Sequence, residues 1–73
     1  MTKEFVLPEA PEGWTEVHNV NYTTWFDTAG RAAVEWYHSG RVLARPDAAL
    51  LLSIPIDRWG VDSARPTWGV RYA

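Results

Sequence analysis

Cysteine is absent from this sequence, lysine occurs once, and the longest wholly apolar stretch covers only residues 48–52. The lack of cysteine excludes a disulfide framework, a zinc–thiolate centre and a thiol nucleophile. The apolar stretch is far too short to cross a bilayer, which takes ~20 apolar residues. The amino terminus also lacks the basic and apolar segments of a signal peptide. We therefore expect a protein of the cytoplasm without membrane contact.

Residues that could act in catalysis or bind a metal are equally scarce. Serine occurs three times, and none of these serines lies in the G-x-S-x-G pattern of a nucleophile elbow. A metal site built on His18 and His38 needs a third ligand, either Glu16 or Glu35, and no ligand spacing supports it. A chain this short rarely encloses a ligand pocket of ~300–1,000 Å³. We expect no enzymatic activity, catalytic residue, metal, cofactor or small-molecule substrate.

The charge is unevenly distributed along the chain. The formal net charge is −2, but residues 1–27 carry −4 and residues 28–73 carry +2. An acidic balance disfavours general nucleic-acid binding, which depends on clustered cations. Six of the seven cations are arginine, the cation enriched at protein interfaces. The base composition of a GC-rich genome is the alternative explanation, which nine alanines also fit.

Residues 1–13 are expected to form a flexible N-terminal arm, and residues 14–73 a single small globular domain. Pro8 and Pro11 favour extended backbone in the residues that precede them. One apolar triplet stands between acidic residues in this arm, and the segment comprises Glu4, Phe5, Val6, Leu7, Glu9 and Glu12. Such a segment either orders on a partner or is a mobile terminus without a role.

Residues 14–45 have the composition of antiparallel strands, since valine, threonine and aromatic residues dominate. We expect a first strand before a turn at residues 19–21, and a second turn at residues 28–30 with Gly30 in the left-handed conformation. A three-residue loop there predicts three facing pairs: Phe26 with Ala32, Thr24 with Val34, and Tyr22 with Trp36. These six side chains would share the apolar face.

A further turn at Ser39-Gly40 continues the strands as a meander. A two-residue loop predicts that Tyr37 faces Val42 and that Trp36 faces Leu43. Arg41 and Arg45 then fall on the apolar side, which indicates an edge strand or a different loop length. Solvated charges at an edge are the simplest interpretation of the two arginines.

Residues 46–53 change in character. Pro46, Asp47 and the following alanines and leucines favour a short helix that Pro55 ends, with a buried strand as the alternative. Residues 57–66 contain Gly60 and Pro66 and are expected to form a loop, and residues 67–73 alternate like a last strand. The predicted fold is α+β and mainly β: a three- to four-stranded antiparallel meander with one short helix. Most of the five tryptophans are expected in its core.

In its length and its arginine- and alanine-rich, lysine-poor composition, the chain resembles small transcription regulators of bacteriophages that infect Xanthomonas hosts. No motif carries this resemblance. It implies a monomeric, non-enzymatic protein of the host cytoplasm that binds the large subunits of the host RNA polymerase. It also implies inhibition of initiation by sigma displacement, together with antitermination. The expected contacts are those of the arm, Glu4, Phe5, Val6, Leu7, Glu9 and Glu12, together with Arg41 and Arg45. The alternative is a single-stranded nucleic-acid-binding module that uses an aromatic sheet face, although the acidic first third disfavours direct nucleic-acid binding.

Overall fold

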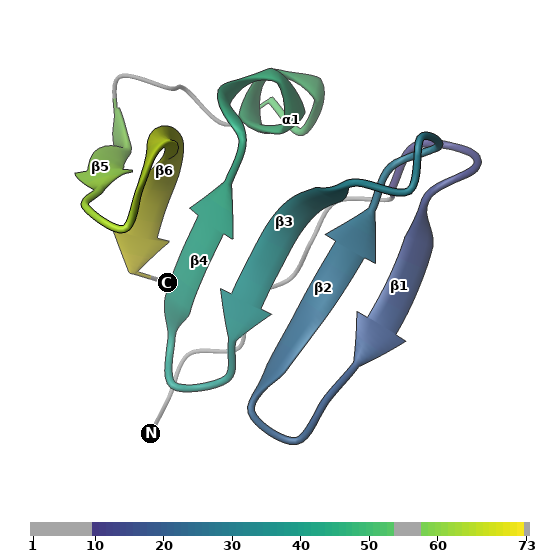
Figure 1. The fold of residues 1–73 in the computed structure, drawn as a ribbon, viewed down its shortest axis with the longest axis horizontal. Coiled ribbons are helices and arrows are strands. Elements are labelled where there is room, and N and C mark those ends of the chain that lie inside the picture. Colours follow the sequence, from purple (N-terminus) through teal and green to yellow (C-terminus); the bar gives the residue numbers. More distant parts are fainter. Residues whose placement is uncertain (1–9, 54–57, 73) are drawn as a thin grey trace.

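The structure, a computed structural model, describes residues 10–53 and 58–72 of the chain. Within these residues the chain forms six strands and one short helix (Figure 1). Their bounds in chain order are β1 (Thr15–His18), β2 (Tyr22–Phe26), β3 (Ala32–Tyr37), β4 (Arg41–Ala44), α1 (Pro46–Leu51), β5 (Gly60–Asp62) and β6 (Arg65–Tyr72). The predicted fold class, mainly β with one short helix, is confirmed.

The strands form one open antiparallel sheet in the order β1-β2-β3-β4-β6-β5. The first four strands follow chain order, which confirms the predicted meander. The sheet has six strands where three to four were predicted, and β6 confirms the last strand expected in residues 67–73. β6 returns to lie beside β4, and β5 pairs with β6 at the far edge. The expectation of a loop over residues 57–66 is wrong for residues 60–62, because an edge strand this short leaves no alternating pattern in the sequence, and for residues 65 and 66, which begin β6.

A β-bulge sets the pairing of β2 with β3. Phe26 pairs with Ala32 as predicted, but the next pair is Trp25 with Val34, so Ala33 is the extra residue. Beyond the bulge, Thr24 pairs with Glu35, and the remaining pairs shift likewise. The predicted faces are therefore wrong, because one extra residue moves each later partner to the other side of the sheet. Gly30 does have a positive φ of 78° in the turn.

The turn between β3 and β4 is one residue longer than predicted. Trp36 pairs with Val42, which leaves residues 38–40 as a three-residue loop. Gly40 has a φ of 122° there, and its N–H donates to the carbonyl of Tyr37 at 2.8 Å. Of the two explanations offered for Arg41 and Arg45, the different loop length is therefore confirmed and the edge strand is wrong, because β4 lies between β3 and β6.

The helix α1 begins where the sequence predicts. Pro46 occupies its first turn, where the missing N–H costs nothing, and the Asp47 carboxylate accepts the N–H of Ala48 at 3.0 Å. Ser53, with a φ of 58°, follows its last turn. Pro55, the expected end, lies outside the described residues.

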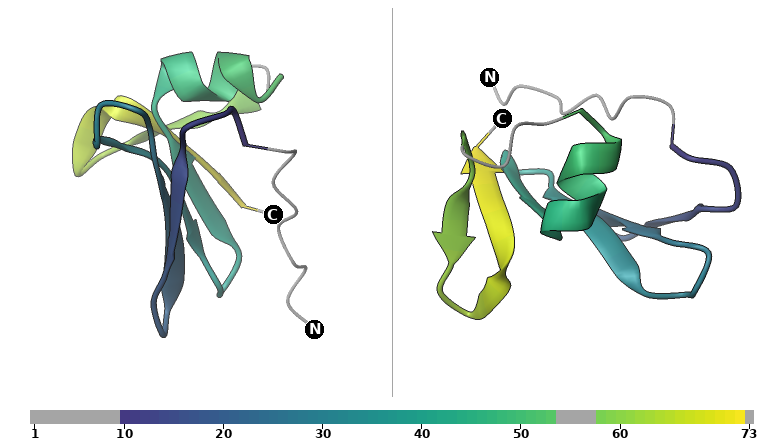
Figure 2. Two further views of the ribbon diagram at one scale, coloured as in Figure 1. Left: turned by 90° about the vertical axis from the view of Figure 1, so that its right-hand side faces the viewer. Right: turned by 90° about the horizontal axis from the view of Figure 1, so that it is seen from above.

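Figure 2 shows α1 across one end of the sheet, and its Ala48 and Ala49 belong to a core cluster whose strand residues share one face of the sheet. We call this side of the sheet the core face and the opposite side the open face. The core cluster comprises Trp25, Ala33, Val34, Val42, Ala44, Ala48, Ala49 and Leu52. Trp14, Trp36 and Trp59 pack against it, as does Ala10 from the expected arm. Trp25 is 6% exposed, and the other three rings are half-buried against the cluster, so each removes part of its ~200 Å² from water. The core role predicted for most tryptophans is confirmed.

Candidate functional site: the open face of the sheet

Side-chain alternation divides the sheet residues between the two faces. Trp25, Val34 and Val42 point to the core face, so their strand neighbours point to the open face. The residues assigned to the open face in this way are Val17, Tyr22, Thr24, Glu35, Tyr37, Arg41, Leu43, Trp68 and Val70. Tyr22, Tyr37, Arg41 and Trp68 therefore share this face with Thr24 and Leu43, which are only 4% and 1% exposed, so neighbouring side chains cover part of it.

Tyr22, Tyr37 and Arg41 form a row across β2, β3 and β4, which we call the Tyr-Arg row. The rings of Tyr22 and Tyr37 are stacked, with centroids 5.4 Å apart and an interplanar angle of 26°. The guanidinium carbon of Arg41 lies 4.6 Å from the centroid of Tyr37. Tyr37 thus has a ring on one side and a cation on the other, and all three side chains are half-buried. The three side chains therefore contact one another within the chain itself.

A second arginine–aromatic contact lies nearer β6. The guanidinium carbon of Arg65 is 4.2 Å from the centroid of the Trp68 ring. Two nitrogens of Arg65 donate to the two carboxylate oxygens of Glu35, at 2.9 and 3.2 Å, and Asp62 lies 3.4 Å from its Nε. The hydrogen bonds to Glu35 raise the pKa of Arg65 further above its ordinary value, so its charge is permanent. This ion pair ties the start of β6 to β3 across β4.

The predicted partner-binding residues have different surroundings. Arg41 lies in the Tyr-Arg row, whereas Arg45 donates to the carboxylate of Asp27 at 2.6 Å and is only 16% exposed. Glu12 is exposed beside the turn that leads into β1. The other predicted contacts, Glu4, Phe5, Val6, Leu7 and Glu9, lie outside the described residues.

Asp27 closes the β2–β3 turn as well as binding Arg45. One of its carboxylate oxygens accepts the backbone N–H groups of Ala29 and Arg31, at 2.9 and 3.0 Å. The hydrogen bond from the Arg31 backbone, followed by that from Arg45, lowers the pKa of Asp27 below its ordinary value of 3.8. Arg45 therefore serves the fold at this point, as a link between the turn and the start of α1.

The two histidines converge on one threonine hydroxyl. His18 Nδ1 lies 3.2 Å and His38 Nε2 3.0 Å from Thr23 Oγ1, and His18 Nε2 lies 2.8 Å from a carboxylate oxygen of Glu16. This chain of contacts resembles an acid–base–nucleophile arrangement, but Thr23 is fully buried and its hydroxyl cannot meet a substrate. Among the described residues, no group of three or more histidines, cysteines or acids is placed to hold a metal ion.

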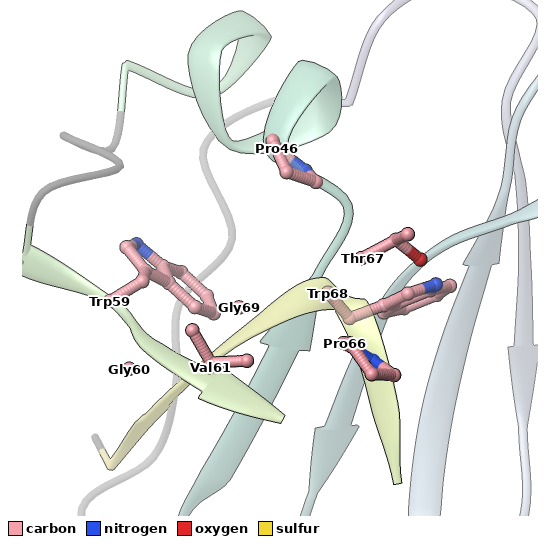
Figure 3. Close-up of a pocket in the computed structure, with 8 residues that line it drawn as sticks. All are labelled: Pro46, Trp59, Gly60, Val61, Pro66, Thr67, Trp68 and Gly69. Carbon is pink, nitrogen blue, oxygen red and sulfur yellow. The ribbon is translucent and has the colours of Figure 1, made fainter. Parts of the chain in front are cut away.

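A shallow hollow of about 170 Å³ lies at the β5–β6 end of the sheet (Figure 3). Trp59 and Trp68 stand on opposite sides of it, and Pro46, Val61 and Pro66 complete its apolar lining. Its volume is below the ~300–1,000 Å³ of ordinary ligand pockets. It has no charged side chain to orient a ligand, so the Tyr-Arg row is the better candidate for recognition.

Sequence reasoning missed the Tyr-Arg row because it placed Tyr22 and Tyr37 on opposite sides of the sheet. The signal that finds the row is the loop length, since a three-residue turn at residues 38–40 brings Arg41 beside Tyr37. The bulge at Ala33 then aligns Tyr22 with Tyr37.

Comparisons of the chain with protein families, curated proteins and solved structures found no match. In the part of the chain that the structure describes, no helix has the length and apolar character needed to span a membrane.

Proposed function

We propose that the chain is a non-enzymatic regulator that binds the large subunits of bacterial RNA polymerase, inhibits initiation by displacing sigma, and promotes antitermination. The resemblance in length and composition supports the choice of partner. The Tyr-Arg row is the observation that supports protein binding. Tyrosine and arginine are the residue types enriched among binding hot spots, and this row lies outside the core cluster.

The arrangement of the rings separates protein binding from its alternative. A single-stranded nucleic-acid module needs free ring faces on which bases stack. Tyr37 already has Tyr22 on one face and Arg41 on the other, and one face of Trp68 is covered by Arg65. The row instead offers ring edges, phenol hydroxyls and one guanidinium, which suit hydrogen bonds to a protein surface. We therefore rank protein binding above nucleic-acid binding.

The first experiment measures binding of the full chain to purified RNA polymerase, with and without sigma, by biolayer interferometry. We expect a dissociation constant at or below about 1 µM, which corresponds to ~8 kcal/mol of binding free energy. We also expect weaker binding to the holoenzyme and loss of promoter-dependent transcripts in vitro. Absence of binding at ten times that concentration would contradict the proposal.

Two arginine variants test the surface. Arg41→Gln removes the cation over Tyr37 and should weaken polymerase binding about tenfold, the loss typical of one hot-spot residue. Arg58→Gln removes an exposed charge away from the row and should leave the affinity unchanged. Equal losses of affinity in the two variants would show that net charge, and not the position of Arg41 in the row, determines binding. A chain lacking residues 1–9 tests the expected arm contacts in the same assay.

Oligonucleotide binding decides the alternative. Fluorescence anisotropy with a labelled single-stranded oligonucleotide should show no binding at physiological salt. Salt-dependent binding that Tyr37→Ala abolishes, without polymerase binding, would favour the nucleic-acid module.

A further inference from the structure

The first strand, β1, leaves an unprotected edge of the sheet. It lies at one end of the strand order, so its outer side pairs with no strand among the described residues (Figure 1). All four of its side chains are exposed. β5, at the other end of the sheet, is one residue shorter. β1 is therefore the longer of the two free edges.

The hairpin geometry identifies the backbone groups that face outward. The N–H of Asn19 donates to the carbonyl of Tyr22 at 2.8 Å, so this pair is hydrogen-bonded. Antiparallel ladders alternate hydrogen-bonded and non-hydrogen-bonded pairs. The next pair, His18 with Thr23, is then non-hydrogen-bonded, and so is the pair that Glu16 forms with Trp25. The backbone N–H and C=O groups of Glu16 and His18 therefore point away from β2.

β1 has little of the protection that blocks sheet edges. It contains no proline, lysine or bulge, and its protection is limited to its length of four residues and the single carboxylate of Glu16. Residues 4–30 contain no lysine or arginine at all, while Glu12 and Glu16 are exposed at and before this edge. Val17, which follows Glu16 and is 40% exposed, points to the open face. One face of this edge therefore carries Glu16, whose carboxylate lies 2.8 Å from His18 Nε2, and the other face carries Val17 together with Thr15.

We infer that β1 is the docking strand for a basic extended segment of a partner protein, which adds to the sheet through the outward backbone groups of Glu16 and His18. Main-chain hydrogen bonds supply the contact in strand addition, and alternate side chains supply the specificity. A lysine or arginine of that segment lies on the side of Glu16, and an apolar residue lies against Val17. A second copy of the chain would bring a second acidic edge to the same place. The inference concerns β1 and is independent of the proposed polymerase contact through the Tyr-Arg row.

The test is an NMR titration of the ¹⁵N-labelled full chain with a short peptide that alternates lysine and valine. We expect saturable shift changes at residues 15–18 and slower exchange of the Glu16 and His18 amides. A matched peptide with glutamate in place of lysine should bind about tenfold more weakly, a difference of ~1.4 kcal/mol. Absence of saturable changes in β1, or equal affinity for the two peptides, would overturn the inference.

Two substitutions at Glu16 distinguish the contribution of its backbone N–H to peptide binding from that of its carboxylate. Glu16→Pro removes an outward N–H, which edge strands tolerate, and should abolish peptide binding while the β2–β4 amide spectrum stays unchanged. Glu16→Gln keeps the N–H and should weaken binding only about threefold, the size of a surface charge pair. If Glu16→Pro fails to fold, His18→Pro removes the other outward N–H. Unchanged binding in a folded proline variant, or a dimer of the free chain in sedimentation, would refute the docking strand.

Discussion

The ion pair between Glu35 and Arg65 is the contact whose removal most directly tests the fold. Glu35→Gln keeps the shape of the side chain and removes its charge, while two arginine N–H groups lose a charged acceptor. Exposed pairs contribute ~0.2–1 kcal/mol, and breaking a buried pair costs about 3–5 kcal/mol. The Glu35 and Arg65 side chains are 14% and 36% exposed, so this pair lies between the two limits. We expect Glu35→Gln to lower the free energy of unfolding by about 1.5–2 kcal/mol.

Urea denaturation followed by circular dichroism measures this loss. In a domain of this size, ~1 kcal/mol shifts the melting temperature by about 4–8 °C, so a thermal melt should show a fall of roughly 6–16 °C. A double-mutant cycle with Arg65→Gln should give a coupling energy of about 1 kcal/mol. Asp47→Asn is the matched control, because its carboxylate is 66% exposed and 3.6 Å from Arg45. A loss no larger than that of the control, or a coupling energy near zero, would refute the reasoning.

Three further predictions follow from single contacts. The pKa of Asp27 is lowered in the folded state, so its ionised carboxylate stabilises the fold at pH values above the unfolded pKa of 3.8. This stabilisation is lost as the pH falls through the lower folded pKa. Asp27→Asn should therefore make the free energy of unfolding depend less steeply on pH in the acid range. Gly69→Ala would place a Cβ 2.9 Å from the Cβ of Trp59, so it should cost about 1–3 kcal/mol and move the Trp59 indole signal in NMR spectra. Thr23→Val removes the hydroxyl between the two histidines and should cost about 1 kcal/mol in urea denaturation, while ¹⁵N imidazole spectra report the changed environment of His18.

The order and type of the elements could be predicted from the sequence where local chemistry decides them. Gly30 marks a turn that needs a positive φ, and Pro46 with Asp47 marks the start of α1. Both signals depend only on residues close in sequence, so tertiary contacts do not override them. β5 gave no such signal, since three residues at an edge bury too little to impose a pattern.

The candidate site was less predictable because it depends on register. Ala33 gives no sign in the sequence that it forms a bulge, yet it decides which residues Tyr22 faces. The partner of Arg65 is equally hidden, because Glu35 lies thirty residues away and meets it only after β6 returns beside β4. Long-range pairs of this kind follow from the completed sheet and cannot be read from spacing.

The place of β6 between β4 and β5 has a consequence for synthesis on the ribosome. The four strands of the meander and α1 emerge first, while the side of β4 that β6 will pair with remains open. Only when residues 65–72 leave the exit tunnel does that row of amides find its partners. A stop codon before Arg65 would therefore release a chain with an exposed inner strand, a nascent product suited to aggregation or to proteolysis.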